Sequence, residues 1–125
     1  MNFTYAIICL VIGLILVTII DTLGAISSRK LNFNYAYLSV CSFAVYIALG
    51  YMLSKQYSVQ IALLIASLVG LYDGTVGLKL SIMLKANNKL NAQENIDILN
   101  LKTAITMVGI ACLFVFVGYK LATLN

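Results

Sequence analysis

The sequence predicts an all-α membrane protein with four transmembrane helices, and two observations carry that prediction. Of the 125 residues, 62% are hydrophobic and only 10% are charged, whereas roughly a quarter of the residues in a soluble domain are charged. The apolar residues also form continuous runs, and no proline interrupts them. A membrane β-barrel would instead show alternating strands of about 10 residues, so the runs favour helices.

Four segments are long and apolar enough to cross a bilayer core of about 30 Å, which takes around 20 helical residues. They cover residues 3–26, 35–53, 57–84 and 101–124. The connections are short apart from the third, residues 85–100, which is polar and rich in asparagine. Within it, Asn91 and Glu94 have the spacing of a helix N-cap and its following glutamate, which predicts a further helix from about Ala92. We interpret the whole chain, residues 1–125, as a single domain.

The distribution of basic residues predicts the orientation of these helices, since cytoplasmic connections carry an excess of lysine and arginine. Five of the eight basic residues lie in or next to the first and third connections, with Lys79 close by: Arg29, Lys30, Lys85, Lys89 and Lys102. The opposite side has only Lys55 and Lys120. In this multi-pass integral membrane protein, both termini are therefore expected outside the cytoplasm.

Three short sequence patterns recur in the same order, which predicts two tandem helical hairpins, residues 1–55 and 56–125. Leu16–Asp21 and Leu68–Asp73 both begin with Leu-Val and end with an apolar or aromatic residue and aspartate. Lys-Leu-Asn follows each aspartate, and Gly-Tyr-x-Leu ends the second and fourth helices. Both hairpins would enter the membrane from the same side, as parallel repeats related by an axis along the membrane normal. The alternative is a four-helix domain in which these matches arose by chance.

Asp21 and Asp73 form the candidate site, because a carboxylate costs about 2.5 to 3.5 kcal/mol near the bilayer centre and usually faces protein, a partner or water. Residues three or four positions away share the helix face of each aspartate, and several of them are small. Small residues at four-residue spacing let helices approach closely. The helix-packing candidates are Ala66, Gly70, Gly74 and Gly77.

Two interpretations of the aspartates stay open. In the functional one, two carboxyl groups removed from water load and release a proton or exchange it for a cation. In the structural one, they hold helices together through hydroxyl groups, or Asp73 pairs with Lys79. The candidate supporting residues are Tyr72, Thr18, Tyr46 and Ser28.

The leading hypothesis is a small membrane transporter or channel-like protein that binds a proton, cation or cationic solute through Asp73 and Asp21. Four helices enclose little volume, so a pathway is expected between the subunits of a homo-oligomer in the lipid bilayer. The alternative is a non-catalytic membrane subunit, such as an assembly, regulatory or immunity factor, that binds a larger membrane protein.

Other classes of function lack their usual residues. The chain has no histidine, and its three cysteines, Cys9, Cys41 and Cys112, lie in apolar surroundings, so we expect no metal site, no cofactor and no enzymatic activity. The basic residues form no cluster of four or more, so nucleic acid is not an expected partner.

Overall fold

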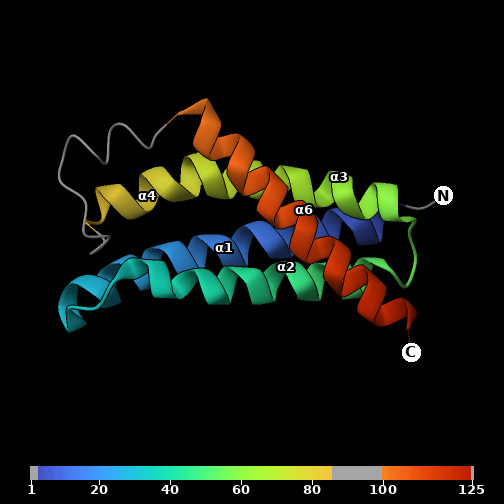
Figure 1. Cartoon of the computed structure of the whole chain (residues 1–125), viewed down its shortest axis with the longest axis horizontal. Coiled ribbons are helices and arrows are strands. Elements are labelled where there is room, and N and C mark those ends of the chain that lie inside the picture. Colours follow the sequence, from blue (N-terminus) through green and yellow to red (C-terminus); the bar gives the residue numbers. More distant parts are fainter. Residues whose placement is uncertain (1–2, 86–99, 125) are drawn as a thin grey trace.

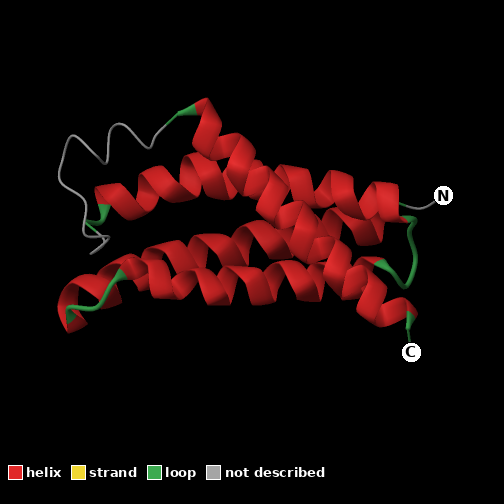
Figure 2. Ribbon diagram, viewed as in Figure 1, coloured by secondary structure: helices red, strands yellow, loops and turns green. Residues whose placement is uncertain are grey.

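The computed structural model describes residues 3–85 and 100–124, and within these ranges every regular element is helical, as predicted (Figure 2). The elements are α1 (Thr4–Leu31), η1 (Tyr35–Leu38), α2 (Ser39–Leu53), α3 (Val59–Tyr72), η2 (Asp73–Gly77), α4 (Leu78–Met83) and α6 (Leu101–Thr123). The segments α3, η2 and α4 follow one another without a break and form one long third helix. The helix predicted from about Ala92 lies outside the described residues.

Three helices are long and apolar enough to cross a membrane, namely α1, the third helix and α6. The predicted second span, residues 35–53, is not one long α-helix. Helix α2 has only 15 residues and rises about 22 Å, less than the roughly 30 Å of a bilayer core. The four residues of the 3₁₀ turn η1 precede it and add about 8 Å. The second segment therefore reaches a comparable length by changing helix type.

The four helices are arranged as two pairs that run in opposite directions (Figure 1). Helix α1 and the third helix share one direction, and α2 and α6 share the other. Helix α6 crosses the bundle obliquely, so it packs against α2 and α3 over much of its length and against η2 near its start. It diverges from α4. The bundle is consequently closely packed at one end and more open at the other.

A glycine from each helix brings the backbones of α2 and α6 into close contact. A Cβ atom on Gly50 would fall on the carbonyl oxygen of Val115, and a Cβ atom on Gly118 would fall on the carbonyl oxygen of Ile47. Each glycine thus faces the residue three positions before the other glycine. No side chain fits at either position, so these two glycines set the distance between the helices.

Tyr57 joins three elements at the closely packed end. Its hydroxyl oxygen accepts a hydrogen bond from the Ala6 N–H at 3.0 Å, and its carbonyl oxygen accepts one from the Tyr119 hydroxyl at 2.8 Å. The ring of Tyr5 stacks on it with 6.2 Å between centroids. These contacts fix the start of α1 relative to the third helix and α6.

Candidate functional site: a buried pair of carboxyl groups

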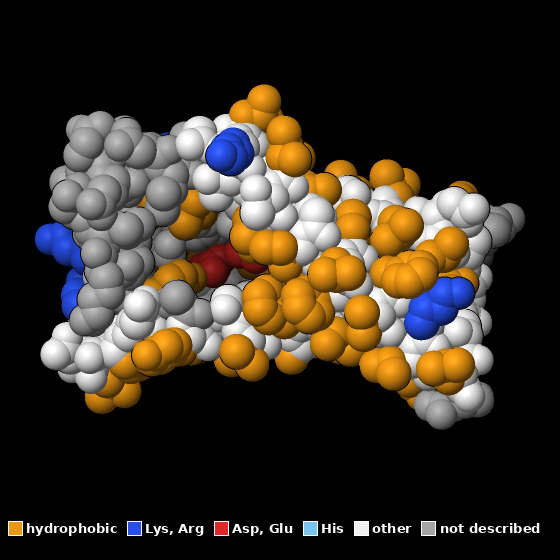
Figure 3. Space-filling view, in the orientation of Figure 1, with side chains coloured by type: hydrophobic (Ala, Val, Ile, Leu, Met, Phe, Trp, Pro, Cys, Tyr) orange, Lys and Arg blue, Asp and Glu red, His pale blue; other side chains and the backbone are white. Residues whose placement is uncertain are grey.

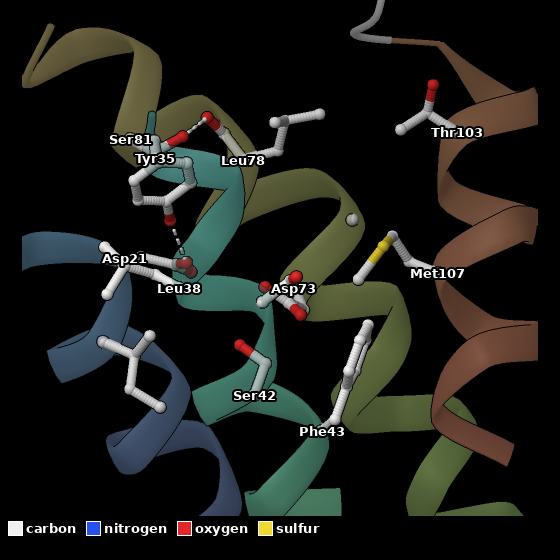
Figure 4. A pocket seen from close by; sticks show the side chains of 13 residues that line it. Asp21, Tyr35, Leu38, Ser42, Phe43, Asp73, Leu78, Ser81, Thr103 and Met107 are labelled. Carbon is white, nitrogen blue, oxygen red and sulfur yellow. Dashed lines mark hydrogen bonds between the residues drawn. The ribbon is translucent and has the colours of Figure 1, made fainter. Parts of the chain in front are cut away.

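Asp21 of α1 and Asp73 of η2 meet inside the bundle (Figure 4). Both side chains are buried, with 4% and 7% of their surface exposed. A Cβ atom on Gly77 would collide with Asp21 Oδ2 and lie 3.2 Å from Asp73 Oδ1. The missing side chain of Gly77 therefore provides the space in which the two carboxyl groups approach each other. Gly77, predicted as a helix-packing residue, contacts the aspartates instead of a neighbouring helix backbone.

Each carboxyl group accepts a hydrogen bond from one tyrosine. The Tyr35 hydroxyl of η1 donates to Asp21 Oδ1 at 2.6 Å, and the Tyr46 hydroxyl of α2 donates to Asp73 Oδ2 at 2.6 Å. The other two oxygens, Asp21 Oδ2 and Asp73 Oδ1, are those that face Gly77. Each aspartate is thus held at one oxygen by a tyrosine and presents its second oxygen towards the other aspartate.

A cavity of about 170 Å³ lies beside the pair, between α1, α2, the third helix and the first half of α6. Apart from the aspartates, its polar lining consists of hydroxyl groups, those of Tyr35, Ser39, Ser42, Ser81 and Thr103. No lysine or arginine is among the described residues that line it. Figure 3 shows atoms of acidic side chains in red at the bottom of a hollow. Asp21 and Asp73 are the acidic residues in the part of the chain that the structure describes, so the red atoms belong to them. The pair is therefore buried in the protein but adjoins an open space.

Lys79 lies away from the pair, although Asp73 was a possible partner for it. It is exposed and lines a separate groove with Asn100 and Leu101, between the third helix and the start of α6. Ion pairing with Lys79 thus does not balance the charge of the aspartates in this structure.

The π-helical turn η2 places Asp73 in the site. In a π turn the backbone hydrogen bonds span five residues instead of four. Here the Leu78 N–H donates to the carbonyl oxygen of Asp73, five residues earlier. The Thr75 hydroxyl donates to the Leu71 carbonyl at 2.6 Å, a bond that competes with regular helix geometry. Single π turns are frequent at functional sites. This turn was not predicted from the sequence, although Gly74 and Gly77, one and four residues after Asp73, were a signal of irregular backbone.

Of the four supporting residues predicted from the sequence, one binds an aspartate and the other three make hydrogen bonds to other groups. Tyr46 binds Asp73 directly. The hydroxyls of Tyr72 and Thr18 share a hydrogen bond of 2.6 Å with each other and line a shallow groove between α1 and α3. Ser28 is buried, and its hydroxyl donates to the carbonyl oxygen of Ala25 at 2.9 Å.

Tyr35 was not among the predicted site residues. It lies fourteen positions after Asp21 and beyond the end of α1, so no helical periodicity connects the two. The turn of the chain brings it back: Asn32 ends α1 in the left-handed conformation, with φ of 56°, and η1 follows. Only the fold itself could identify this residue.

The small residues of α3 and η2 pack against α6 within the same chain. Ala66 is fully buried. A Cβ atom on Gly70 would lie 2.8 Å from Ala111 Cβ, and one on Gly74 would lie 2.8 Å from Met107 Cβ. The predicted close contact at Gly70 and Gly74 is thus an intramolecular one.

Together, fold and site define a helical bundle with three helices of membrane-spanning length around a buried pair of carboxyl groups. Among the described residues no three His, Cys, Asp or Glu side chains converge, so the pair itself is the candidate ligand-binding group. No protein-family model matches the chain, and no curated protein or solved structure is significantly similar to it.

Proposed function

We propose that the protein is an integral membrane transporter or channel-like protein in which Asp21 and Asp73 bind a proton, a cation or a cationic solute. The observation that carries this proposal is the meeting of two buried carboxyl groups in a cavity without a basic residue in its described lining. Buried charges are normally paired, and acidic residues at membrane depth commonly mark ion or proton pathways. Two tyrosine hydroxyls satisfy only two of the four carboxyl oxygens. A positively charged ligand would complete the site.

Location in a membrane is supported by the side chains on the surface of the long helices. Large apolar side chains are exposed along α1, the third helix and α6, for example those of Ile15, Leu64 and Leu113 at 53%, 61% and 59%. Such extensive apolar surface is unfavourable in water and suits contact with lipid. We further propose that both termini lie outside the cytoplasm, because five of the eight basic residues lie in or next to the first and third connections.

We also propose that the chain consists of two tandem hairpins related by an approximate two-fold axis along the membrane normal. The reciprocal contacts of Gly50 and Gly118 support this, since both glycines begin the recurring Gly-Tyr-x-Leu pattern. Val17 and Val69, each four residues before its aspartate, are both fully buried.

A pair of serines supports the same symmetry. Ser28 follows Asp21 by seven residues and Ser81 follows Asp73 by eight; both are buried, and each donates to the carbonyl oxygen three residues earlier. The π turn adds one residue to the second copy, which accounts for the difference in spacing. In this proposal the second hairpin is a copy of the first that carries one additional residue in the π turn at Asp73 and a longer connection between its helices.

Reconstitution of the purified protein in liposomes tests the proposed function. With a pH-sensitive dye inside and a panel of monovalent cations outside, we expect flux for the wild type and flux at the level of empty liposomes for Asp73→Asn. Asparagine keeps the shape of aspartate and can accept the Tyr46 hydrogen bond, but it cannot titrate. Asp97→Asn makes the same chemical change outside the pair and should keep wild-type flux.

Two results would argue against the proposal. Unchanged flux and pH dependence in both Asp73→Asn and Asp21→Asn would show that the carboxyl groups are structural. A wild-type protein that moves none of the ions in the panel would favour the alternative, a non-catalytic membrane subunit bound to a larger membrane protein.

A further inference from the structure

Two hydrogen-bond acceptors, Asp21 Oδ2 and Asp73 Oδ1, border the space at Gly77, and no described residue places a donor between them. Asp21 Oδ2 is buried and has no hydrogen-bond partner among the described residues. Asp73 Oδ1 lies on the other side of the same space, and the two carboxyl groups are close enough to interact directly. Tyr35 and Tyr46 donate to the outer oxygens of the pair, so neither hydroxyl satisfies the inner ones.

No lysine or arginine among the described residues that line the cavity supplies a positive charge to the inner oxygens. The tyrosines that bind the pair come from η1 (Tyr35) and α2 (Tyr46). The other described polar side chains that line the adjoining cavity are hydroxyl groups, those of Ser39 and Ser42 from α2, Ser81 from α4 and Thr103 from α6. Two ionised carboxylates in contact repel each other strongly at a buried site, because little water screens them. One positive charge between the inner oxygens removes that repulsion.

We propose that the ligand of this site is a single proton, shared between Asp21 Oδ2 and Asp73 Oδ1. This inference rests on the proposed function, since it names the ligand of the same site. One proton turns the contact between two acceptors into an O–H···O hydrogen bond and leaves one net negative charge on the pair. The hydroxyls of Tyr35 and Tyr46 stabilise that charge at the outer oxygens. A larger cation would have to push the carboxyl groups apart to occupy the same position.

Titration of the carboxyl groups tests the shared proton directly. The protein is labelled with carboxyl-¹³C aspartate, purified in detergent and followed by NMR across the pH range, with Asp97→Asn used to assign the third labelled aspartate. In the wild type, Asp21 and Asp73 should lose their protons in two steps at least about one pH unit apart, because they titrate as a coupled pair. Asp21→Asn and Asp73→Asn should each show one step that falls between the two wild-type steps.

Gly77→Ala, with Gly109→Ala as its matched control, tests the geometry. The added methyl group at Gly77 would occupy the space where the inner oxygens meet, so the carboxyl groups should separate and their two steps should move together. A Cβ atom on Gly109 meets nothing within 4 Å, so that variant should keep the wild-type separation.

Wild-type carboxyl groups that titrate in coincident steps, at the pH found for the single variants, would overturn the shared proton. The titration needs no transport, so the two proposals can fail separately. Flux that depends on Asp73 without two separate steps would leave the proposed function in place and remove the shared proton. Two separate titration steps without flux of any ion would support the shared proton and remove the proposed transport function.

Discussion

Gly118→Ala tests the contact between α2 and α6 with the smallest possible change, one methyl group. The new Cβ atom would fall on the carbonyl oxygen of Ile47 and lie 2.8 and 2.9 Å from the carbonyl carbon and Cα of the same residue. All three atoms belong to the backbone of α2, so no side-chain rotation can relieve the overlap. The two helices must move apart instead, and the packing between them is lost.

The size of the effect follows from a comparison with Gly109→Ala on the same helix. Forcing an extra methyl group into a packed contact costs about 1 to 3 kcal/mol. Replacing glycine by alanine within a helix also gains about 0.5 to 1 kcal/mol. Gly109 is exposed and meets nothing within 4 Å, so its variant receives the gain without the cost. Because the gain is common to both variants, their free energies of unfolding should differ by about 1 to 3 kcal/mol.

Denaturant titrations of the two variants, purified in the same detergent, measure this difference. Gly118→Ala should unfold at the lower denaturant concentration, and Gly50→Ala should behave like it because the contact is reciprocal. If Gly118→Ala were as stable as Gly109→Ala, the backbones of α2 and α6 would not be in contact at Gly118, and the reasoning would fail.

Two further predictions concern packing within the chain and orientation in the membrane. Gly70→Leu should lower the free energy of unfolding by about 3 kcal/mol or more, because a Cβ atom there already lies 2.9 Å from the Met107 carbonyl oxygen and 3.0 Å from the Cα of Val108; wild-type thermal stability in detergent would place this face against lipid. A reporter that is active only in the cytoplasm should be inactive when fused to the C-terminus, since the basic residues predict that this end is external. Strong activity would reverse the proposed orientation.

The sequence predicted the helices well because continuous apolar runs are a local property. The predicted spans at residues 3–26 and 101–124 agree with α1 and α6, although α1 continues to Leu31. The predicted second segment, residues 35–53, has the same bounds as η1 and α2 together, but its first four residues form a 3₁₀ turn instead of an α-helical turn. The amino-acid composition of residues 35–38 does not distinguish a 3₁₀ turn from an α-helical turn. The difference depends on tertiary contacts such as the hydrogen bond from Tyr35 to Asp21.

The site could be predicted only in part. Asp21 and Asp73 were identified because a carboxyl group is costly in an apolar segment, a property that each residue shows by itself. Their hydrogen-bond partners depend on contacts between residues far apart in the chain. Tyr46, which donates to Asp73 across 27 positions, was predicted as a supporting residue but was not assigned to either aspartate, and Tyr35 was not predicted. The role of Gly77 also depends on the π turn, because helical spacing alone suggests a residue that packs against another helix.

The structure separates the elements that hold the bundle together from those that surround the aspartates. Contacts of Tyr57 and the glycines of α2 and α6 fix the closely packed end, where backbone meets backbone. At the other end α6 diverges from α4, and Thr103 and Met107 line one wall of the cavity. A site that exchanges a ligand needs carboxyl groups that stay together and access that changes. The elements α1, η1, α2 and η2 hold both aspartates and their tyrosines, whereas α6 contributes only Thr103 and Met107 to the described lining of the cavity.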